Sequence, residues 1–459
     1  MKTKFTLLAI LFLAFNVGFA QQDEECMTKL SIFHEYVKSK NYDAAYEPWM
    51  AVRKKCPKFN NAIYIDGEKI LDHKIEKSSD AEKVAFINDL LKLWDERAMH
   101  FGSKTPKGEY AAKACQLQYD FRKELNKSDL ELYECFDAAY KLDKGTFTNP
   151  KSLYTYFSLM VDLYDAKQKS AAELFNKYDD VAEKVEEEVK NYSEELNKLI
   201  EKDSTGQSFT SKEKKYQKYY ESYLTAYDQI SGSMDSKLGG RANCENLIPL
   251  YEKDFEANKT DALWLKRAVS RMFYKECTED PLYEKLVKAY DEASPSADTK
   301  VFVAGILLKN DKVSEAEGYF NQAYELETDN FKKAKLAYRI GTILKGKGRY
   351  GQARTYFNNS LKYNPSNGRP HLAIAAMYAA SAKDCGDTNF NKRAVFWLAE
   401  EEARKAGRVD PTLSKDAAQS AASYGAKAPT KSEIFNEGNA GQTIRIGCWI
   451  GRSITVPKL

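Results

Sequence analysis

One segment constrains the fold of this chain more than any other. It runs from Ala334 to Pro365 and reads AKLAYRIGTILKGKGRYGQARTYFNNSLKYNP. Its apolar residues recur at helical spacing on both sides of a glycine-rich turn, which predicts two antiparallel helices. Small residues fall at the three places where such helices would cross, namely Gly341, Ala353 and Ser360. Small side chains there let the helix axes approach closely, while the larger ones between them fill the remaining space.

The same alternation of small and large residues returns in other segments. The preceding unit carries Val303, Ala304, Leu307, Val313, Ala316, Phe320 and Ala323, and the following unit carries Ile374, Ala375, Tyr378, Ala399, Ala403, Ala406 and Pro411. Near the start of the chain the pattern is carried by Tyr42, Ala45, Trp49 and Pro57. This pattern resembles the tetratricopeptide repeat (TPR), a family built from stacked antiparallel helix pairs. We expect further helical hairpins, with a weaker form of the pattern, over residues 59–142 and 245–294.

Residues 151–240 depart from the repeat. Two stretches carry apolar residues at steps of three and four, and a turn-forming segment over 203–211 separates them, which predicts a hairpin of two long antiparallel helices. The first stripe consists of Leu174, Tyr178, Val181, Val185, Val189, Tyr192, Leu196 and Leu199, and the second of Tyr216, Tyr220, Tyr223, Tyr227, Ile230 and Met234. This hairpin would offer a second contact surface, and one use open to it is self-association.

The end of the chain changes character again. Its last part reads GQTIRIGCWIGRSITVP, in which Ile444, Ile446, Cys448 and Ile450 would share one face of a strand. We therefore expect an all-α fold, a TPR-type α-solenoid of antiparallel helix pairs, with a long helical-hairpin insertion and a small C-terminal β-hairpin. The expected divisions are a signal peptide (1–20), N-terminal TPR-like repeats (21–150), the long hairpin (151–240), C-terminal TPR repeats (241–412), and a linker with the β-hairpin cap (413–459).

The first twenty residues predict the compartment. Lys2 and Lys4 precede an apolar run from Phe5 to Phe19, and Ala20 supplies a small residue for cleavage, as in a secretory signal peptide. We expect an exported protein, periplasmic or associated with the outer membrane, with no transmembrane segment in the mature chain. The formal charge of the whole chain is only +3. Such a balance argues against the cationic field of a non-specific nucleic-acid binder.

Eight cysteines in an exported chain predict disulfides. Three pairs are expected at the open mouths of three predicted hairpins: Cys26–Cys56, Cys115–Cys135 and Cys244–Cys277. The turns of the second and third hairpins would fall at 126–128 and 258–260. Cys385, in an inserted loop near 381–391, and Cys448, in the terminal hairpin, remain. Pairing these two would fasten the tail to the last repeat and cap the array.

Several segments together resemble a group of exported TPR proteins typical of Bacteroidota envelopes. They are the secretory start, KRAVFWLAEEEARKAGRVDP, ANCENLIPLYEKDF and the ending GCWIGRSITVP. The resemblance covers nearly the whole mature chain. It implies protein binding of the TPR type by a periplasmic or outer-membrane-associated scaffold, and it brings no catalytic residue.

Motifs of enzyme chemistry are present only in incomplete form. Gly346 to Gly351 matches G-x-G-x-x-G, but a dinucleotide site needs a strand before this motif, and here a helix precedes it. His34-Glu35 begins an H-E-x-x-H zinc motif, but Lys38 stands where the second histidine would be. We therefore expect no enzyme activity, no cofactor and no metal.

The leading functional hypothesis is a protein-interaction scaffold or adaptor of the cell envelope. Its partners would be other envelope proteins, including components of an outer-membrane complex, and not nucleic acid. The binding groove would lie on the first helices of the C-terminal pairs. Its predicted residues are Tyr338, Thr342, Lys345, Arg369 and Leu372. The alternative is a periplasmic chaperone or assembly factor for outer-membrane or secreted proteins. A glycan binder, a third class, would need tyrosines exposed in a groove.

Overall fold

The computed structural model describes residues 24–459, so the predicted signal peptide and its cleavage site lie outside the described residues. The chain forms two compact units, the first ending at Val181 and the second beginning at Ala182. Within the described residues the fold is all-α apart from one two-stranded sheet. The expected fold class is therefore confirmed. None of the helices in residues 24–459 is both long and apolar enough to cross a membrane.

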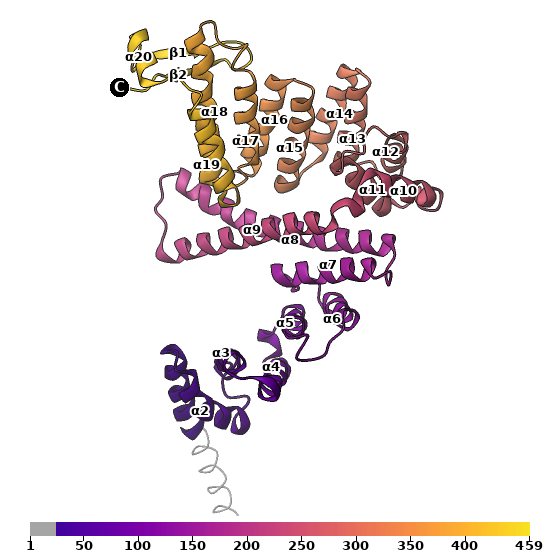
Figure 1. Ribbon diagram of the computed structural model, residues 1–459, viewed down its shortest axis with the longest axis vertical. Helices are drawn as coiled ribbons and strands as arrows, with labels where there is room; N and C mark the ends of the chain where they lie inside the picture. The colour runs from indigo at the N-terminus through magenta and orange to yellow at the C-terminus, as the bar shows by residue number, and fades with distance from the viewer. Residues whose placement is uncertain (1–23) are drawn as a thin grey trace, which may run out of the picture. The chain divides into compact units, whose positions relative to one another are not determined.

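Unit 1 is built from successive helices packed against their neighbours (Figure 1). After a helical stretch over 24–38 come α2 (Tyr42–Lys55), α3 (Ala62–Lys77), α4 (Asp80–His100), the short helix η1 (Gly102–Lys104), α5 (Lys107–Asp120), α6 (Asp129–Leu142), α7 (Pro150–Asp165) and the first part of α8 (Ala171–Ser204). The fully buried Trp49 anchors the start of this core, and its indole nitrogen donates to the Ile63 carbonyl at 2.7 Å. A Cβ at Gly67 would lie 2.6 Å from the same indole, so only glycine allows α3 to pack this closely.

α7 packs against α5 and α6 of unit 1. We had grouped this segment with the long hairpin, over 151–240. The sequence does not show whether α7 packs with α5 and α6 or with the hairpin. Buried residues lie on nearly all sides of α7, so its apolar pattern does not point to one neighbour.

The start of α8 is fixed in unit 1 by a buried lysine. The Lys177 ammonium lies 4.4 Å from the ring centroid of Tyr156 and 3.0 Å from a carboxylate oxygen of Asp137. Tyr133 and Tyr140 place two more rings within 6.0 Å of it. A buried ammonium is tolerated here because a carboxylate and three ring faces replace the water that it loses.

Unit 2 continues through α8 and contains the TPR-like pairs. Its remaining elements are α9 (Ser211–Leu238), η2 (Gly239–Ala242), α10 (Cys244–Asn258), α11 (Ala262–Tyr274), α12 (Pro281–Ala293), α13 (Ala297–Lys309), α14 (Val313–Leu326), α15 (Asn330–Gly346), α16 (Tyr350–Tyr363), α17 (Arg369–Ala380), α18 (Asn389–Val409), η3 (Pro411–Leu413), α19 (Ser414–Gly425), α20 (Lys431–Glu437), β1 (Thr443–Ile446) and β2 (Arg452–Thr455). The helices α13 and α14, α15 and α16, and α17 and α18 pack as consecutive pairs.

The α15–α16 pair has the crossing expected from its small residues. A Cβ added to Gly341 would lie 2.7 Å from the ring of Phe357, so glycine is required for this approach. Ala353 and Ser360 are fully buried on α16. Gly348 has φ +71° in the turn between the two helices. The G-x-G-x-x-G match thus forms an interhelical turn, with no strand before it.

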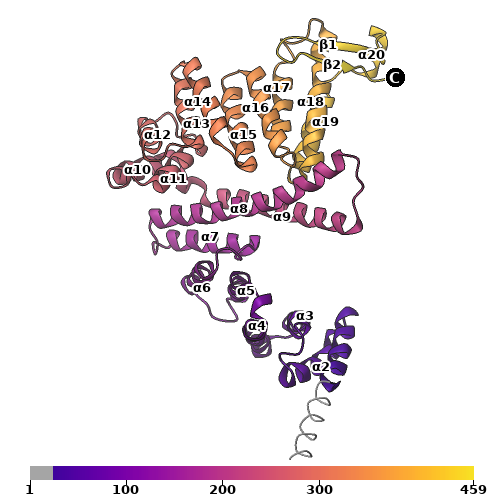
Figure 2. The same cartoon turned by 180° about the vertical axis from the view of Figure 1, so that it is seen from behind.

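The long hairpin forms as predicted, from α8 and α9. Tyr192 of α8 stacks on Tyr223 of α9, with ring centroids 5.0 Å apart. We expected a contact surface open to other molecules. One side of the hairpin lies along the ends of helices of unit 2: α9 contacts η3, and both ribbon views show the hairpin beneath α18 and α19 (Figures 1 and 2).

The C-terminal hairpin pairs β1 with β2 in antiparallel register, with Ile444 opposite Ile454. The strands are shorter than expected, and Cys448 and Ile450 lie in the connecting turn and not on a strand face. The left-handed backbone at Cys448 (φ +47°) reverses the chain there. The buried Ile446 and Ile450 nevertheless join the core of unit 2.

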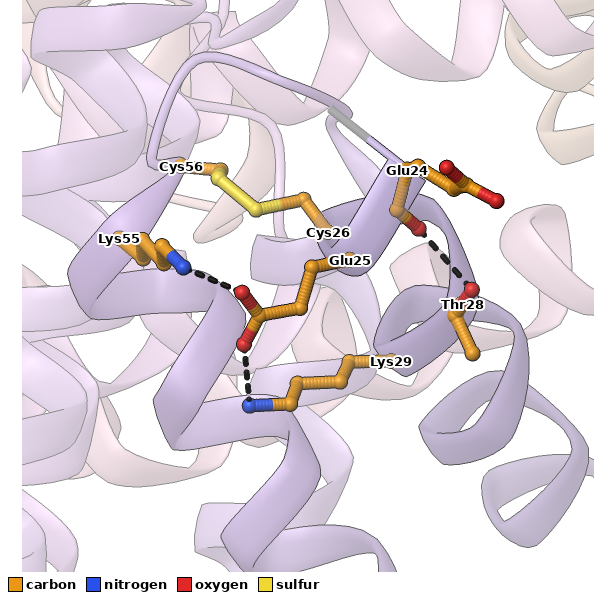
Figure 3. The surroundings of a disulfide bond; sticks show 7 residues. All are labelled: Glu24, Glu25, Cys26, Thr28, Lys29, Lys55 and Cys56. Atoms are coloured by element: carbon orange, nitrogen blue, oxygen red, sulfur yellow. Dashed lines mark hydrogen bonds and ion pairs between the residues drawn. A yellow bond between two sulfur atoms is a disulfide. The ribbon is translucent and has the colours of Figure 1, made fainter. Parts of the chain in front are cut away.

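All four disulfides link the cysteines in the expected pairs: Cys26–Cys56, Cys115–Cys135, Cys244–Cys277 and Cys385–Cys448. The first closes the start of unit 1, where the Glu25 carboxylate beside it bridges Lys29 and Lys55 (Figure 3). The second differs from expectation, because Cys115 and Cys135 lie within α5 and α6 and not at the mouth of the hairpin. The two helices pack side by side, so these mid-helix positions come within 5.7 Å between Cα atoms.

Candidate functional site

Three of the predicted groove residues lie together on α15. Thr342 is exposed, and its hydroxyl donates to the Tyr338 carbonyl at 2.9 Å. Tyr338 is half-buried because its ring packs on Phe357, at 5.6 Å between centroids. Lys345 follows one turn later and is also half-buried. This face of α15 therefore offers one exposed hydroxyl, one ring edge and one ammonium group.

The other two predicted residues have different surroundings. Arg369 begins α17 and donates to the Asp228 carboxylate of α9 at 2.6 Å, so the hairpin already engages it. Leu372 is half-buried against a small cluster formed by Ala375, Ala403 and Ala421. The structure therefore does not bring all five residues to one open surface.

The hairpin occupies the edge of unit 2 where several helices begin. Polar contacts join its two helices to this edge. They are Glu183 with Arg267 at 2.9 Å, Glu186 with Lys335 at 2.5 Å, Lys190 with Asp329, Asn197 with Asn364 at 3.0 Å, and Asp228 with Arg369. Asp329 caps the start of α15, and Arg369 is the first residue of α17. The surface farther along α13 and α15 lies outside these contacts.

A side-chain cluster on that surface joins three alternate helices. The Arg339 guanidinium of α15 donates to the Asp298 carboxylate of α13 at 2.8 Å and to the Tyr274 hydroxyl of α11 at 3.2 Å. It also lies 5.0 Å from the ring centroid of Phe302. Tyr274 is 60% exposed although it is a large aromatic residue. We call the surface formed by Tyr274, Asp298, Arg339, Thr342 and Lys345 the α11–α13–α15 face.

Sequence reasoning missed Arg339 and Tyr274. Arg339 lies three residues before Thr342, so helical spacing from the predicted groove residues would have pointed to it. Tyr274 belongs to a segment in which the repeat pattern is weak, and it meets α15 only through folding across 65 residues of chain. No local signal in the sequence marks that contact.

A pocket of about 270 Å³ lies between the last helix pair and the C-terminal hairpin. Its lining residues are Arg354, Asn358, Ile374, Tyr378, Glu402, Ile450, Gly451 and Arg452. Arg354 donates to the carbonyls of Ile450 at 2.6 Å and Trp449 at 3.1 Å, and Arg452 donates to Glu402 at 3.2 Å. These charged groups bond to the protein itself. Their hydrogen bonds hold the C-terminal hairpin against the last helix pair.

Glu402 is the most deeply buried charge in that pocket. Lys405 lies 2.9 Å from one of its oxygens, and His371 Nδ1 lies 2.7 Å from the other. Burial acts to raise the pKa of Glu402, but hydrogen bonds from His371 and Lys405 outweigh it and lower the pKa to about 2. The carboxylate is therefore ionised at neutral pH and acts as an ion-pair centre.

Three of the four histidines lie beside carboxylates. His34 lies 2.6 Å from Asp66, His73 lies 3.3 Å from Asp43, and His371 lies beside Glu402 as described above. Within residues 24–459 no three histidine, cysteine or acidic side chains gather as a metal would require. His34, in the incomplete zinc motif, therefore contacts a single carboxylate.

Comparisons with known proteins found similarities among solved structures. No protein-family model matches the chain, and no curated protein sequence does. Human IFIT1, solved as a dimer with PPP-AAAA, aligns with 80% of this chain and 74% of its own, at 14% identity and a TM-score of 0.34. Yeast Tom70 aligns over 90% of both chains, at 11% identity and a TM-score of 0.30. A tetratricopeptide repeat protein from Parabacteroides merdae aligns with 69% of this chain and 99% of its own, at 11% identity and a TM-score of 0.25.

The TPR-like helical-repeat fold is shown by the consecutive helix pairs of the chain itself. Its four disulfides indicate an oxidising, extracytoplasmic location.

Proposed function

We propose that this protein is a non-enzymatic scaffold or adaptor of the bacterial cell envelope, and that a partner protein binds to the α11–α13–α15 face. The observation that carries the proposal is the Tyr274–Arg339–Asp298 cluster. It places a 60% exposed tyrosine above an arginine whose side chain is 13% exposed, where three helices meet. Tyrosine and arginine are enriched among the residues that dominate protein-binding energy.

The rigidity of the supporting helices strengthens the proposal. Phe302 lies beneath the Arg339 guanidinium and is buried, as are Val301 and Ala304 on the same helix. A guanidinium held by a carboxylate and a ring face loses little further freedom when a partner binds. Thr342 and Lys345 extend the polar surface along α15, so the partner segment would run beside this helix.

The experiment is affinity purification of the full chain after cross-linking in the cells that make it. Partner ratios are then measured by mass spectrometry. We expect one reproducible partner in near-equimolar amount, and we expect its recovery to fall about tenfold in the Tyr274→Ala/Arg339→Ala variant. The matched control is Tyr36→Ala/Lys253→Ala, which removes an exposed tyrosine and an exposed lysine elsewhere on the chain.

Two outcomes would count against the proposal. If the partner binds the double variant as well as the parent chain, the α11–α13–α15 face is not the binding surface. If many proteins are recovered in small and variable amounts, the chain acts on transient clients as a periplasmic chaperone. Circular dichroism of each variant verifies that the helices remain folded.

A further inference from the structure

The first half of α9 carries an unusual array of tyrosines. Six rings from α8 and α9 form one connected cluster: Tyr192, Tyr216, Tyr219, Tyr220, Tyr223 and Tyr227. Tyr219 packs on Tyr223 with centroids 4.7 Å apart, and Tyr216 stacks on Tyr220 at 6.0 Å. The buried Tyr227 closes the inner end of the cluster. The outer rings are therefore held in position by the inner ones.

Two of these rings face the solvent. Tyr216 is 44% exposed and Tyr219 is 46% exposed, although packing between two helices would be expected to hide both. Being three residues apart, they lie side by side on one face of α9. Rings that are both exposed and fixed from behind offer a preorganised flat surface to a ligand.

Lysines surround the exposed rings. Lys212, Lys214, Lys215 and Lys218 are all exposed, and none of these four forms an ion pair with another residue in the part of the chain that the structure describes. The nearby acids are engaged instead. Glu213 pairs with Lys202 at 2.6 Å, and Glu221 accepts from Gln217 at 2.9 Å. The face thus has positive charge that the protein itself does not neutralise.

We propose that this face, which we call the tyrosine–lysine face (Lys212, Lys215, Tyr216, Lys218 and Tyr219), binds an acidic polysaccharide. The apolar side of a pyranose ring would stack on Tyr219, because the Lys212 ammonium already lies over the Tyr216 ring, 5.6 Å from its centroid. Its carboxylate or sulfate groups would accept from the lysines. One helical turn advances about 5.4 Å, which is comparable to one sugar unit, so successive sugars would meet successive turns of α9.

The composition of the face favours this ligand over the other classes. Lysine is depleted in the buried centre of protein–protein interfaces, whereas here three exposed lysines belong to the same face as the two rings. Single-stranded nucleic acid also combines rings with negative charge. The disulfides, however, indicate an extracytoplasmic location, which separates the chain from the nucleic acids of the cytoplasm. The assignment is independent of the partner proposed for the α11–α13–α15 face.

The test is affinity electrophoresis of the full chain in gels containing polygalacturonate, with dextran as the neutral polymer and oligo(dT) as a competitor. We expect retardation by polygalacturonate only, weakening as salt is raised because the lysine contacts are screened. Tyr216→Ala/Tyr219→Ala should weaken binding about tenfold, while Tyr216→Phe/Tyr219→Phe should bind nearly as the parent does because the ring faces remain. Lys212→Gln/Lys215→Gln/Lys218→Gln should weaken binding and flatten its salt dependence.

The matched control is Tyr36→Ala/Lys253→Ala, which should leave retardation unchanged. The proposal is overturned if polygalacturonate does not retard the parent chain or if dextran retards it equally. It is also overturned if oligo(dT) displaces the polysaccharide at lower concentration than free polygalacturonate does, which would indicate a nucleic-acid site. The lysine variant keeps every ring of the cluster, so a folding defect in the alanine variant would not obscure the result.

Discussion

Glu402 shows how a single buried charge fastens the end of the molecule. Its side chain is only 7% exposed, yet the carboxylate meets His371, Lys405 and Arg452 from three different directions. Arg452 belongs to β2, so one carboxylate links the last helix pair with the C-terminal hairpin. Desolvation of Glu402 is offset only while all these partners are present.

We predict that the free energy of unfolding of unit 2 changes less between pH 7 and pH 2.5 in Glu402→Gln than in the parent chain. The carboxyl has an ordinary pKa of 4.5 and a pKa of about 2 in the folded chain. A lowered folded pKa stabilises the fold above pH 4.5, and that stabilisation is lost as the pH falls toward 2. The variant should lose on the order of 2 kcal/mol of unfolding free energy at pH 7 and much less near pH 2.5.

Urea unfolding of the parent and the variant at several pH values measures this difference. Glu401→Gln is the matched control, because Glu401 is exposed on the same helix and pairs with the same Lys405. A difference between Glu402→Gln and the parent that stays constant from pH 7 to pH 2.5 would show that the charge of Glu402 does not matter.

At the scale of elements, local signals predicted the helix pairs well. Gly341, Ala353 and Ser360 marked a crossing that the structure contains, because a clash at such a crossing depends only on the residues of the two paired helices. The packing of the α8–α9 hairpin against the other helices of unit 2 has no comparable signal in the sequence. Asp228 and Arg369 are 141 residues apart, and either would be an ordinary exposed residue in an isolated helix. The same reason explains why the contact of Arg369 with the hairpin could not be predicted.

We predict that the contact between Glu183 and Arg267 helps to hold the hairpin against unit 2. The guanidinium donates to both carboxylate oxygens, at 3.1 and 2.9 Å, and its side chain is largely buried. A double-mutant cycle with Glu183→Gln and Arg267→Gln should give a coupling energy of about 1 kcal/mol.

The exposed pair of Glu256, on α10, and Lys259, just after it, provides the comparison, and its coupling energy should be much smaller than that of the Glu183 contact. Thermal unfolding of the four proteins in each cycle measures both values. Equal coupling energies in the two cycles would mean that the Glu183 contact adds no more than an ordinary surface pair.

At the scale of the whole molecule, two large buried apolar clusters within residues 24–459 lie one in each unit and share no residue. Trp49 belongs to the core of unit 1, and Phe357 belongs to the core of unit 2. In helical-repeat proteins each repeat is stabilised mainly by its neighbours, so unfolding in one unit need not spread to the other. The sequence does not reveal the boundary between Val181 and Ala182, because it falls inside one uninterrupted amphipathic helix, α8.

We therefore predict two unfolding transitions in calorimetry of the full chain, which point substitutions can assign. Trp49→Ala and Phe357→Ala each remove a fully buried ring, a change that costs about 3–5 kcal/mol. If the cores are independent, Trp49→Ala lowers the midpoint of one transition and Phe357→Ala lowers that of the other. If each variant shifts both transitions equally, α8 transmits stability between the units and the chain unfolds as one cooperative structure. Independent transitions would in turn mean that a partner bound to the α11–α13–α15 face raises the midpoint of the Phe357-sensitive transition alone.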